Sequence, residues 1–352
     1  TAYAQNRTGQ GDVRELYDEN CAGCHGDDLA GGSGSSLIDD EWVHGGSDAE
    51  VAASIRDGIP DMGMPGWSET MDDDQVRAMV IFIREMKARS GAEALQASLE
   101  GDVVTAAGHR YGLEEVGSGE GLLWSIAFLP GGAMLVTQRD GVLWHFENGV
   151  RKAIEGIPEV WQHGQGGLLE VAPHPDYAEN GWIYLSYSEH LGAQERDKDA
   201  GMTTVVRGRI ENGRWTAQER LFRVDEALHT SSGAHYGSRF VFDDGYLFFG
   251  IGDRGRMEQA QDLDRPNGKI YRIHDDGRVP ADNPFVDTDG AIPQIWSYGH
   301  RNPQGMDLDP ATGLLWESEH GPRGGDEINL VEKGRNYGWP VITYGMNYNG
   351  TP

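Results

Sequence analysis

Cysteine is scarce in this sequence, and basic residues and long apolar runs are few. Only two cysteines occur in 352 residues, so a framework of several disulfides is excluded. Acidic residues outnumber basic ones by 57 to 29, and the net charge of −28 argues against nucleic acid as a partner. The longest uninterrupted apolar run, residues 78–83, is far below the ~18 residues that a membrane-spanning helix needs. We therefore expect no membrane span.

The composition is that of a globular protein, with 38% hydrophobic residues. At roughly 100–200 residues per domain, the length favours two domains, or one domain plus a large β-architecture. The first residues, Thr1–Gln5, resemble the A-x-A end of a signal-peptide cleavage site. We therefore expect an exported protein, either periplasmic or secreted.

The strongest motif is Cys21-Ala22-Gly23-Cys24-His25. The thiols of Cys21 and Cys24 can add to the vinyl groups of haem, and His25 then becomes an axial ligand of the iron. A redox-active thiol pair or half of a zinc site shares this spacing, but no βαβ pattern surrounds the motif and no second cysteine pair exists. The motif therefore predicts covalently attached haem c.

Three segments with helical patterns accompany the motif. Residues 13–17 place apolar side chains at helical spacing, and residues 47–50 have the Ser-x-x-Glu pattern of a capping box. Residues 72–89 begin with three aspartates, carry an apolar stripe, and have Lys87 and Arg89 in the expected last turn. Three helices around a haem are the pattern of a small class I cytochrome c, which residues 8–92 resemble throughout.

Such a cytochrome needs a sixth iron ligand, and three methionines lie in the right region. Met64 is our choice, because Gly63-Met64-Pro65-Gly66 resembles the ligand loop of that family. Met62 is the alternative, and Met71 is a third candidate. Methionines not bound to iron would pack against the porphyrin. With His25 and Met64 both on the iron, this domain transfers electrons and does no substrate chemistry of its own.

The residue pattern of the sequence changes after this domain. Residues 93–110 predict a linker, with a helical tail near residues 92–99. Short β-rich runs then alternate with Asn-Gly and Asp-Gly turns. The clearest expected strands are residues 134–137, 142–146, 182–187, 205–210, 246–251, 269–273 and 314–316. Many short strands favour an antiparallel sandwich, a barrel or a propeller, and the recurring hairpins favour the propeller.

Ordered motifs run through this β-rich part. They are Gly164-Gln165-Gly166-Gly167, His174-Pro175-Asp176-Tyr177, Gly233-Ala234-His235, Gly252-Asp253-Arg254-Gly255, Asn267-Gly268-Lys269, Asp282-Asn283-Pro284-Phe285, His300-Arg301-Asn302-Pro303, Glu319-His320-Gly321-Pro322, Asp326-Glu327-Ile328-Asn329 and Asn336-Tyr337-Gly338-Trp339-Pro340. In this order they resemble the PQQ-dependent soluble glucose and aldose sugar dehydrogenase family, over residues 111–352. The resemblance implies a multidomain protein, in which a tail of residues 1–7 and an all-α cytochrome c domain precede an all-β six-bladed β-propeller.

The resemblance also implies an active site. PQQ accepts a hydride at its C5 carbon, so the enzyme must remove a proton from the substrate alcohol. The family's base matches His235, and its acidic partner, which orients the imidazole, matches Asp253. Gln165 matches a position that contacts the sugar and the base. Arg301 and Asn302 match the pair that contacts the quinone oxygens, where an Arg stabilises developing negative charge.

The family's active-site calcium bridges the protein and PQQ, and its protein ligands match the backbone carbonyls of Gly321 and Pro322. Calcium accepts carbonyl oxygens readily and acts as a Lewis acid. Glu327 and Tyr337 match positions that hold additional calcium in one branch of the family. We treat His300, which precedes the quinone-contacting pair, as structural.

The resemblance predicts PQQ- and Ca²⁺-dependent oxidation of an aldose at its C1 hydroxyl to a lactone, by hydride transfer to PQQ. Electrons would then pass to the fused haem and to an external acceptor, such as a cytochrome, an oxidase chain or a copper enzyme. One alternative is oxidation of a non-sugar alcohol or of an oligosaccharide end at the same site. Another is an electron-transfer or binding protein with a PQQ-free propeller. A calcium-dependent lactonase is disfavoured, because the motifs supply no convergent set of side-chain ligands.

One departure from the family concerns the length. A six-bladed propeller of this family needs more than the ~250 residues available here. The family's late Lys and Arg pair, which grips the PQQ carboxylates, has no counterpart in the sequence. We therefore expect this chain to be part of a longer enzyme, with the C-terminal blades missing. Expressed alone, it is expected to be poorly soluble or free of PQQ.

Overall fold

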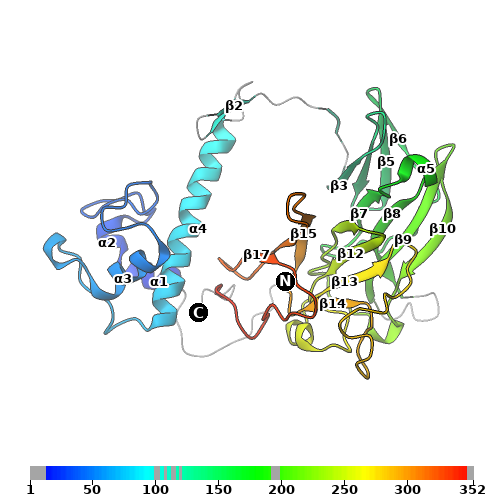
Figure 1. The fold of residues 1–352 in the computed structure, drawn as a ribbon. Coiled ribbons are helices and arrows are strands. Elements are labelled where there is room, and N and C mark those ends of the chain that lie inside the picture. Colours follow the sequence, from blue (N-terminus) through cyan, green and yellow to red (C-terminus); the bar gives the residue numbers. More distant parts are fainter. Residues whose placement is uncertain are drawn as a thin grey trace. The chain divides into compact units, whose positions relative to one another are not determined.

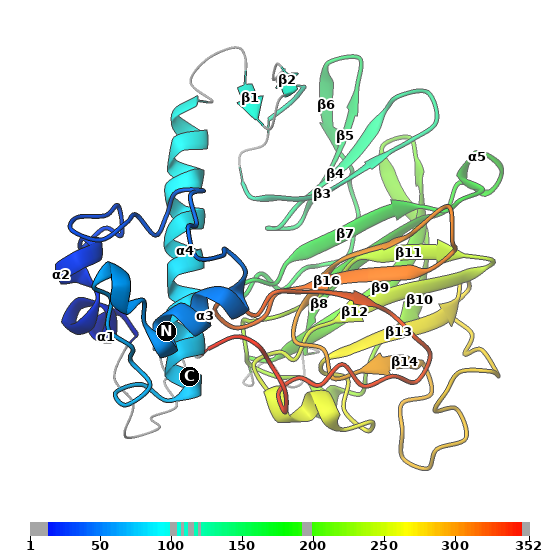
Figure 2. The same ribbon diagram turned by 60° about the vertical axis from the view of Figure 1, so that its left-hand side comes forward.

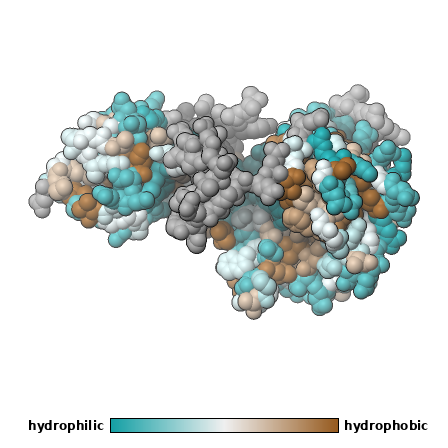
Figure 3. All heavy atoms as spheres, turned by 90° about the horizontal axis from the view of Figure 1, so that it is seen from above, coloured by the Kyte–Doolittle hydropathy of each residue, from teal (hydrophilic) through white to brown (hydrophobic). Residues whose placement is uncertain are grey.

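The computed structural model describes residues 13–98, 104–106, 109–111, 116–118, 121–191 and 199–346. The chain divides into two compact units, of which the first comprises Thr1–Glu114, Gly321–Asp326 and Thr343–Pro352. The second comprises Glu115–His320 and Glu327–Ile342. Within the described ranges, no helix combines the length and apolar character that spanning a bilayer requires. Hydrophilic residues cover much of the coloured surface in Figure 3, in keeping with the net charge of −28.

The first unit is helical around its core. Its elements are α1 (Val13–Asn20), α2 (Ala22–His25), α3 (Asp48–Asp57), the 3₁₀ turn η1 (Pro60–Met62), α4 (Asp73–Ser98) and the short strands β1 (Val104–Ala106) and β2 (His109–Tyr111). Helices α1, α2 and α3 lie on one side of the long α4 in Figure 1, and in the turned view of Figure 2 α3 crosses in front of it. Their apolar faces form one core, which includes Val13, Tyr17, Val51, Ile55, Met79 and Ile83.

Local capping sets where α3 and α4 begin. The expected capping box is present at α3, where the Ser47 and Glu50 side chains each bond to the other's backbone N–H. At α4, Asp72 Oδ1 accepts from Gln75 N at 2.8 Å and Gln75 Oε1 accepts from Asp72 N at 3.0 Å. The prediction that this helix ends near Lys87 and Arg89 was wrong. Lys87 lies inside the helix and binds Asp40 at 2.7 Å, and α4 continues to Ser98.

The second unit consists of antiparallel sheets, each made from consecutive strands. The described residues of this unit form three four-stranded sheets and one three-stranded sheet. The first sheet comprises β3 (Leu123–Phe128), β4 (Met134–Gln138), β5 (Val142–Glu147) and β6 (Val150–Ala153). The second comprises β7 (Leu168–Pro173), β8 (Ile183–His190), β9 (Gly201–Glu211) and β10 (Arg214–Phe222). The third comprises β11 (Phe240–Asp243), β12 (Tyr246–Ile251), β13 (Lys269–His274) and β14 (Ile295–Tyr298). The last comprises β15 (Pro303–Leu308), β16 (Leu315–Glu319) and β17 (Glu327–Leu330). Short helical turns, α5 (Tyr177–Asn180), η2 (Glu226–Leu228) and η3 (Met257–Gln261), occupy the connections.

Left-handed turn residues close three of the hairpins. Both residues have positive φ at Asn148-Gly149, Asn212-Gly213 and Asp244-Gly245, as two-residue hairpin turns require. The first strands of successive sheets contact one another, β3 with β7, β7 with β11, and β11 with β15. This is a propeller-like arrangement of four sheets in the described residues, which confirms the expected class of fold (Figure 1). The first strands border a cavity of about 640 Å³.

Candidate functional site

His235 and Asp253 form the centre of the candidate active site in the second unit. His235 lies in the loop before β11, and Asp253 directly follows β12. His235 Nδ1 is 2.6 Å from Asp253 Oδ1, and the side chains are 16% and 2% exposed. A buried carboxylate at this distance fixes the orientation of the ring. Because Nδ1 faces Asp253, Nε2 is the nitrogen available to a substrate.

Gln165 approaches the same histidine from another sheet. It lies just before β7, and its Oε1 accepts from His235 N at 2.7 Å. Gly164 and Gly233 make this approach possible, because a Cβ on Gly164 would lie 2.3 Å from the Gly233 carbonyl oxygen. His235 itself has a φ of +52°, a strained conformation for a non-glycine residue. The Gln165 bond holds the histidine backbone in that conformation.

Trp339 completes the surroundings of Asp253 and had no role in the sequence-based prediction. Its indole Nε1 donates to Asp253 Oδ2 at 2.8 Å, while Gly255 N donates to Oδ1 at 2.7 Å. The Arg301 guanidinium lies 5.3 Å from the centre of the Trp339 ring. The sequence signal was the Asn336-Tyr337-Gly338-Trp339-Pro340 motif, but nothing in it indicated which acceptor the indole would find.

Arg301 and Asn302, in the link from β14 to β15, lie beside the dyad. Asp253 N donates to the Arg301 carbonyl at 2.7 Å, and Gly237 N donates to Asn302 Oδ1 at 3.0 Å. Gly252 has no room for a side chain, because a Cβ would lie 2.5 Å from the His235 carbonyl and 2.9 Å from the Arg301 carbonyl. The structure therefore brings together all five residues expected to serve the base and the quinone.

The expected calcium ligands fall in two places. Gly321 and Pro322 lie in the segment Gly321–Asp326, which belongs to the first unit. Gly321 N donates to Asp326 Oδ1 at 2.9 Å, and the Pro322 carbonyl accepts from Gly325 N at 2.8 Å. A carbonyl oxygen has a second lone pair, so both carbonyls remain suitable donors for calcium. Glu327 and Tyr337 are residues of the second unit.

A second candidate site is a cavity inside the first unit. Cys21, His25 and Met64 all line it, together with apolar side chains of α1, α3 and α4. His25 Nδ1 lies 2.8 Å from the Ser35 carbonyl. Such a bond fixes the ring and leaves Nε2 free to bind a metal. Neither Cys21 nor Cys24 is in a disulfide. The Cys21 thiol, the His25 imidazole and the Met64 thioether around one cavity, with Cys24 adjacent to His25 in the sequence, fit haem c.

The Met64 loop is held against the end of α3. Ile59 N and Met64 N bond reciprocally with the opposite carbonyls, at 2.9 and 3.2 Å. Gly58, with a φ of +74°, would place a Cβ 2.4 Å from Gly66 N, so this closure requires glycine. Met62 is 71% exposed and Met71 is buried in the core. Of the three methionines considered, Met64 is the one that lines the cavity.

The fold and the dyad define a class, a propeller-like β-protein with a histidine–carboxylate pair at the ends of its sheets. Comparison with known families then identifies it. Residues 122–352 match the family described as Glucose / Sorbosone dehydrogenase, and the chain belongs to this family. Residues 10–83 match the family Cytochrome C oxidase, cbb3-type, subunit III, which gives the chain an N-terminal cytochrome c domain. The resemblance identified from the sequence motifs is thereby confirmed.

Individual relatives agree with this assignment. The aldose sugar dehydrogenase YliI of Escherichia coli K12 is 48% identical over 233 residues, which are 64% of this chain and 61% of that protein. The apo crystal structure of the E. coli soluble aldose sugar dehydrogenase has a TM-score of 0.62 at 46% identity, covering 66% of both chains. The PQQ-bound aldose sugar dehydrogenase of Streptomyces coelicolor has a TM-score of 0.56 at 30% identity, covering 65% of this chain and 66% of that one. This chain spans about three fifths of the length of YliI.

Proposed function

We propose that this protein is a PQQ- and Ca²⁺-dependent sugar dehydrogenase that oxidises an aldose at C1 to a lactone and delivers the electrons, through its own haem c, to an external acceptor. The observation that carries the proposal is the 2.6 Å contact between His235 Nδ1 and Asp253 Oδ1, in a family member that also has a C-x-x-C-H motif. The relatives described as aldose sugar dehydrogenases support the substrate class.

Each residue of the site has a task in this reaction. His235 Nε2 takes the proton of the C1 hydroxyl, and Asp253 stabilises the imidazolium that results. Trp339 Nε1 and Gly255 N hold the Asp253 carboxylate toward the histidine. Arg301 provides positive charge beside the dyad and would stabilise negative charge on a bound quinone.

The residues that would hold the cofactors are Arg301 and Asn302 for PQQ, the carbonyls of Gly321 and Pro322 for Ca²⁺, and Cys21, Cys24, His25 and Met64 for haem c. When bound, PQQ supplies a hydride-accepting quinone, Ca²⁺ a Lewis acid, and haem c an acceptor of single electrons. Because Cys21 and Cys24 would fix the haem covalently, electron transfer inside the protein would need no collision between separate molecules.

Several wider features belong to the same proposal. We propose that the β-rich part belongs to a six-bladed propeller, which follows the all-α cytochrome domain. We place the protein in the periplasm or outside the cell. Its acceptor is another cytochrome, an oxidase chain or a copper enzyme, and the match to a cbb3-type cytochrome subunit supports an electron-transfer partner.

Stopped-flow reduction of the haem tests this function. The full-length protein, reconstituted with Ca²⁺ and PQQ, is mixed with a panel of aldoses while the c-type absorbance bands are recorded. His235→Asn is the sharpest variant, because asparagine tolerates the +52° φ of this position and lacks the base. His145→Asn on β5 is the matched control.

We expect sugar-dependent reduction in the parent protein and in the control, and its loss in His235→Asn with PQQ binding retained. If no aldose reduces a haem that dithionite does reduce, in protein shown to hold PQQ, the proposal is wrong. An electron-carrier or binding role would then take its place.

A further inference from the structure

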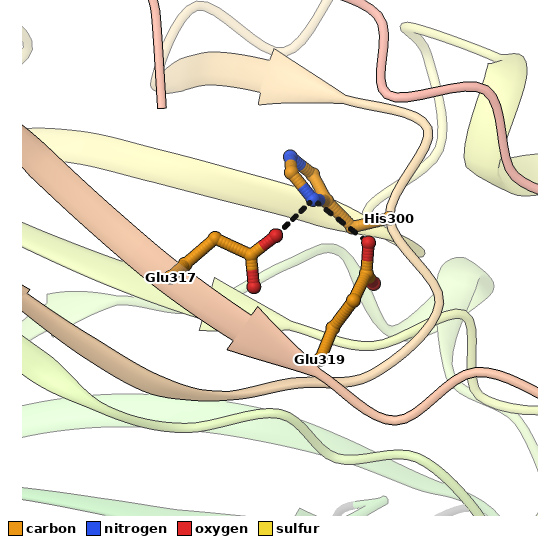
Figure 4. A group of neighbouring side chains, drawn as sticks. All are labelled: His300, Glu317 and Glu319. Carbon is orange, nitrogen blue, oxygen red and sulfur yellow. Dashed lines mark ion pairs between the residues drawn. The ribbon is translucent and has the colours of Figure 1, made fainter. Parts of the chain in front are cut away.

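His300, Glu317 and Glu319 form a buried cluster in the second unit that the proposed reaction does not use. His300 lies in the link between β14 and β15, and the two glutamates are two residues apart on β16, so their side chains share one face (Figure 4). The side chains of His300, Glu317 and Glu319 are 0%, 0% and 3% exposed. One imidazole nitrogen and two carboxylate oxygens converge within 4.8 Å of one another.

The spacing fits a bound ion better than direct hydrogen bonds. His300 Nδ1 lies 3.4 Å from Glu317 Oε1 and 3.6 Å from Glu319 Oε1. A charge-assisted hydrogen bond would be about 2.7–2.9 Å long. Two donors that each lie about 2.0–2.1 Å from a tetrahedral metal ion are about 3.4 Å apart. His300 Nδ1 and Glu317 Oε2 are also buried atoms without a hydrogen bond, an arrangement that is costly unless a further group binds them.

Outer partners hold all three side chains in a ligating orientation. His300 Nε2 is 2.9 Å from Ser297 Oγ, and a bond donated there leaves the Nδ1 lone pair for a metal. Asn329 Nδ2 donates to Glu317 Oε1 at 2.9 Å and to Glu319 Oε1 at 3.4 Å. The backbone N–H groups of Arg301 and Asn302 both donate to Glu319 Oε2, which directs the other oxygen of Glu319 into the cluster.

We propose that His300, Glu317 and Glu319 bind a divalent transition-metal ion, such as Zn²⁺, in a closed structural site. A metal bound to Nδ1 replaces the proton there, and the two carboxylates with the neutral imidazole then carry a charge of −2, which a divalent cation neutralises in a buried place where unpaired charge is costly. An imidazole ligand favours Zn²⁺ over Ca²⁺, which prefers oxygen ligands only. Glu317 Oε2 can bind the same ion as the second oxygen of a bidentate carboxylate, in a distorted tetrahedral site.

The bound ion would act on the active site through Glu319. Because Glu319 accepts both backbone N–H groups of Arg301 and Asn302, fixing its carboxylate fixes the pair expected to contact PQQ. This link rests on the proposed function, whereas metal binding itself is measured without any dehydrogenase activity.

Metal content and thermal stability test the site. The haem-loaded protein, whose cysteines are occupied, is stripped with a chelator, saturated with Ca²⁺, dialysed against Zn²⁺ and analysed by mass spectrometry of its metals. We expect one more Zn²⁺ per chain in the parent protein than in Glu317→Gln, and a higher melting temperature with Zn²⁺ in the parent only. Glu170→Gln, which changes another buried glutamate of the same unit, is the control and should retain the additional ion.

Ser297→Ala keeps the test decisive if Glu317→Gln does not fold. Loss of an outer partner should weaken Zn²⁺ affinity about 10- to 100-fold while all three ligands remain. Equal Zn²⁺ content in the parent and Glu317→Gln overturns the proposal. So does an unchanged Zn²⁺ affinity in Ser297→Ala, or a melting temperature that Ca²⁺ restores as well as Zn²⁺ does.

Discussion

Glu170 makes the stability of the second unit depend on pH in a way that a single substitution removes. Its side chain, on β7, is 5% exposed and lies 3.0 Å from Arg239 Nη1. Burial raises the pKa of this carboxyl from 4.5 to about 7, because loss of hydration outweighs the attraction of Arg239. Arg239 is 37% exposed, so water screens the ion pair.

The sign of the effect follows from the raised pKa. Below pH 4.5 the carboxyl is protonated in both the folded and the unfolded chain, so its ionisation does not lower the stability of the folded state. As the pH rises toward 7, the unfolded chain ionises first, so the folded state loses stability relative to it. At about 1.4 kcal/mol per pKa unit, the loss between pH 5 and pH 8.5 is about 2–3 kcal/mol. Glu170→Gln removes this loss.

Urea unfolding at a series of pH values, followed by tryptophan fluorescence, measures the difference. The free energy of unfolding of Glu170→Gln should rise relative to the parent by about 2–3 kcal/mol from pH 5 to pH 8.5. Glu155→Gln is the control, because Glu155 and its partner Arg214 are 70% and 61% exposed and their pair should contribute little. If the free energies of unfolding of Glu170→Gln and the parent change with pH in parallel across this range, the reasoning is refuted.

Three further predictions concern the two sites. Asp253→Asn should slow sugar-dependent haem reduction about 100-fold or more, because the imidazolium of His235 loses its charged partner, while dithionite still reduces the haem; a rate within a few-fold of the parent would argue against the dyad. Met64→Ala should abolish the absorbance signature of sulfur-ligated ferric haem, and Met62→Ala should preserve it. The reverse result would identify Met62 as the iron ligand. Gly252→Ala should lower stability by about 1–3 kcal/mol in urea unfolding, because its Cβ would overlap two carbonyl oxygens; an unchanged midpoint would show that the loop has room.

The sequence was most informative where the chemistry is local. Asn148-Gly149 and Asp244-Gly245 require positive φ, so the hairpins could be placed before any strand pairing was known. The Ser47–Glu50 capping box is complete within one turn of helix. Lys87 shows the limit of such inference. A basic residue near an expected helix end favours the helix dipole, but this one binds Asp40, far away in the sequence, and the helix continues past it.

Contacts between residues far apart in the chain could not be predicted from the sequence. Gln165, His235 and Asp253 were named as a set only because their motifs resemble a family, and no periodicity links them. The indole of Trp339 reaches Asp253 across 86 residues. The grouping of His300 with Glu317 and Glu319 arises from the pairing of β15 with β16, whereas the motif alone had indicated a purely structural histidine.

The meander topology has a consequence for how this protein matures. Each sheet consists of strands adjacent in the sequence, so it can form as soon as its own segment of chain exists, without waiting for distant partners. The dyad is different, because Gln165 and Trp339 come from outside the sheet that His235 and Asp253 flank. The surroundings of the His235–Asp253 pair are therefore complete only after the chain has grown past Trp339, whereas the earlier sheets can already have formed by then.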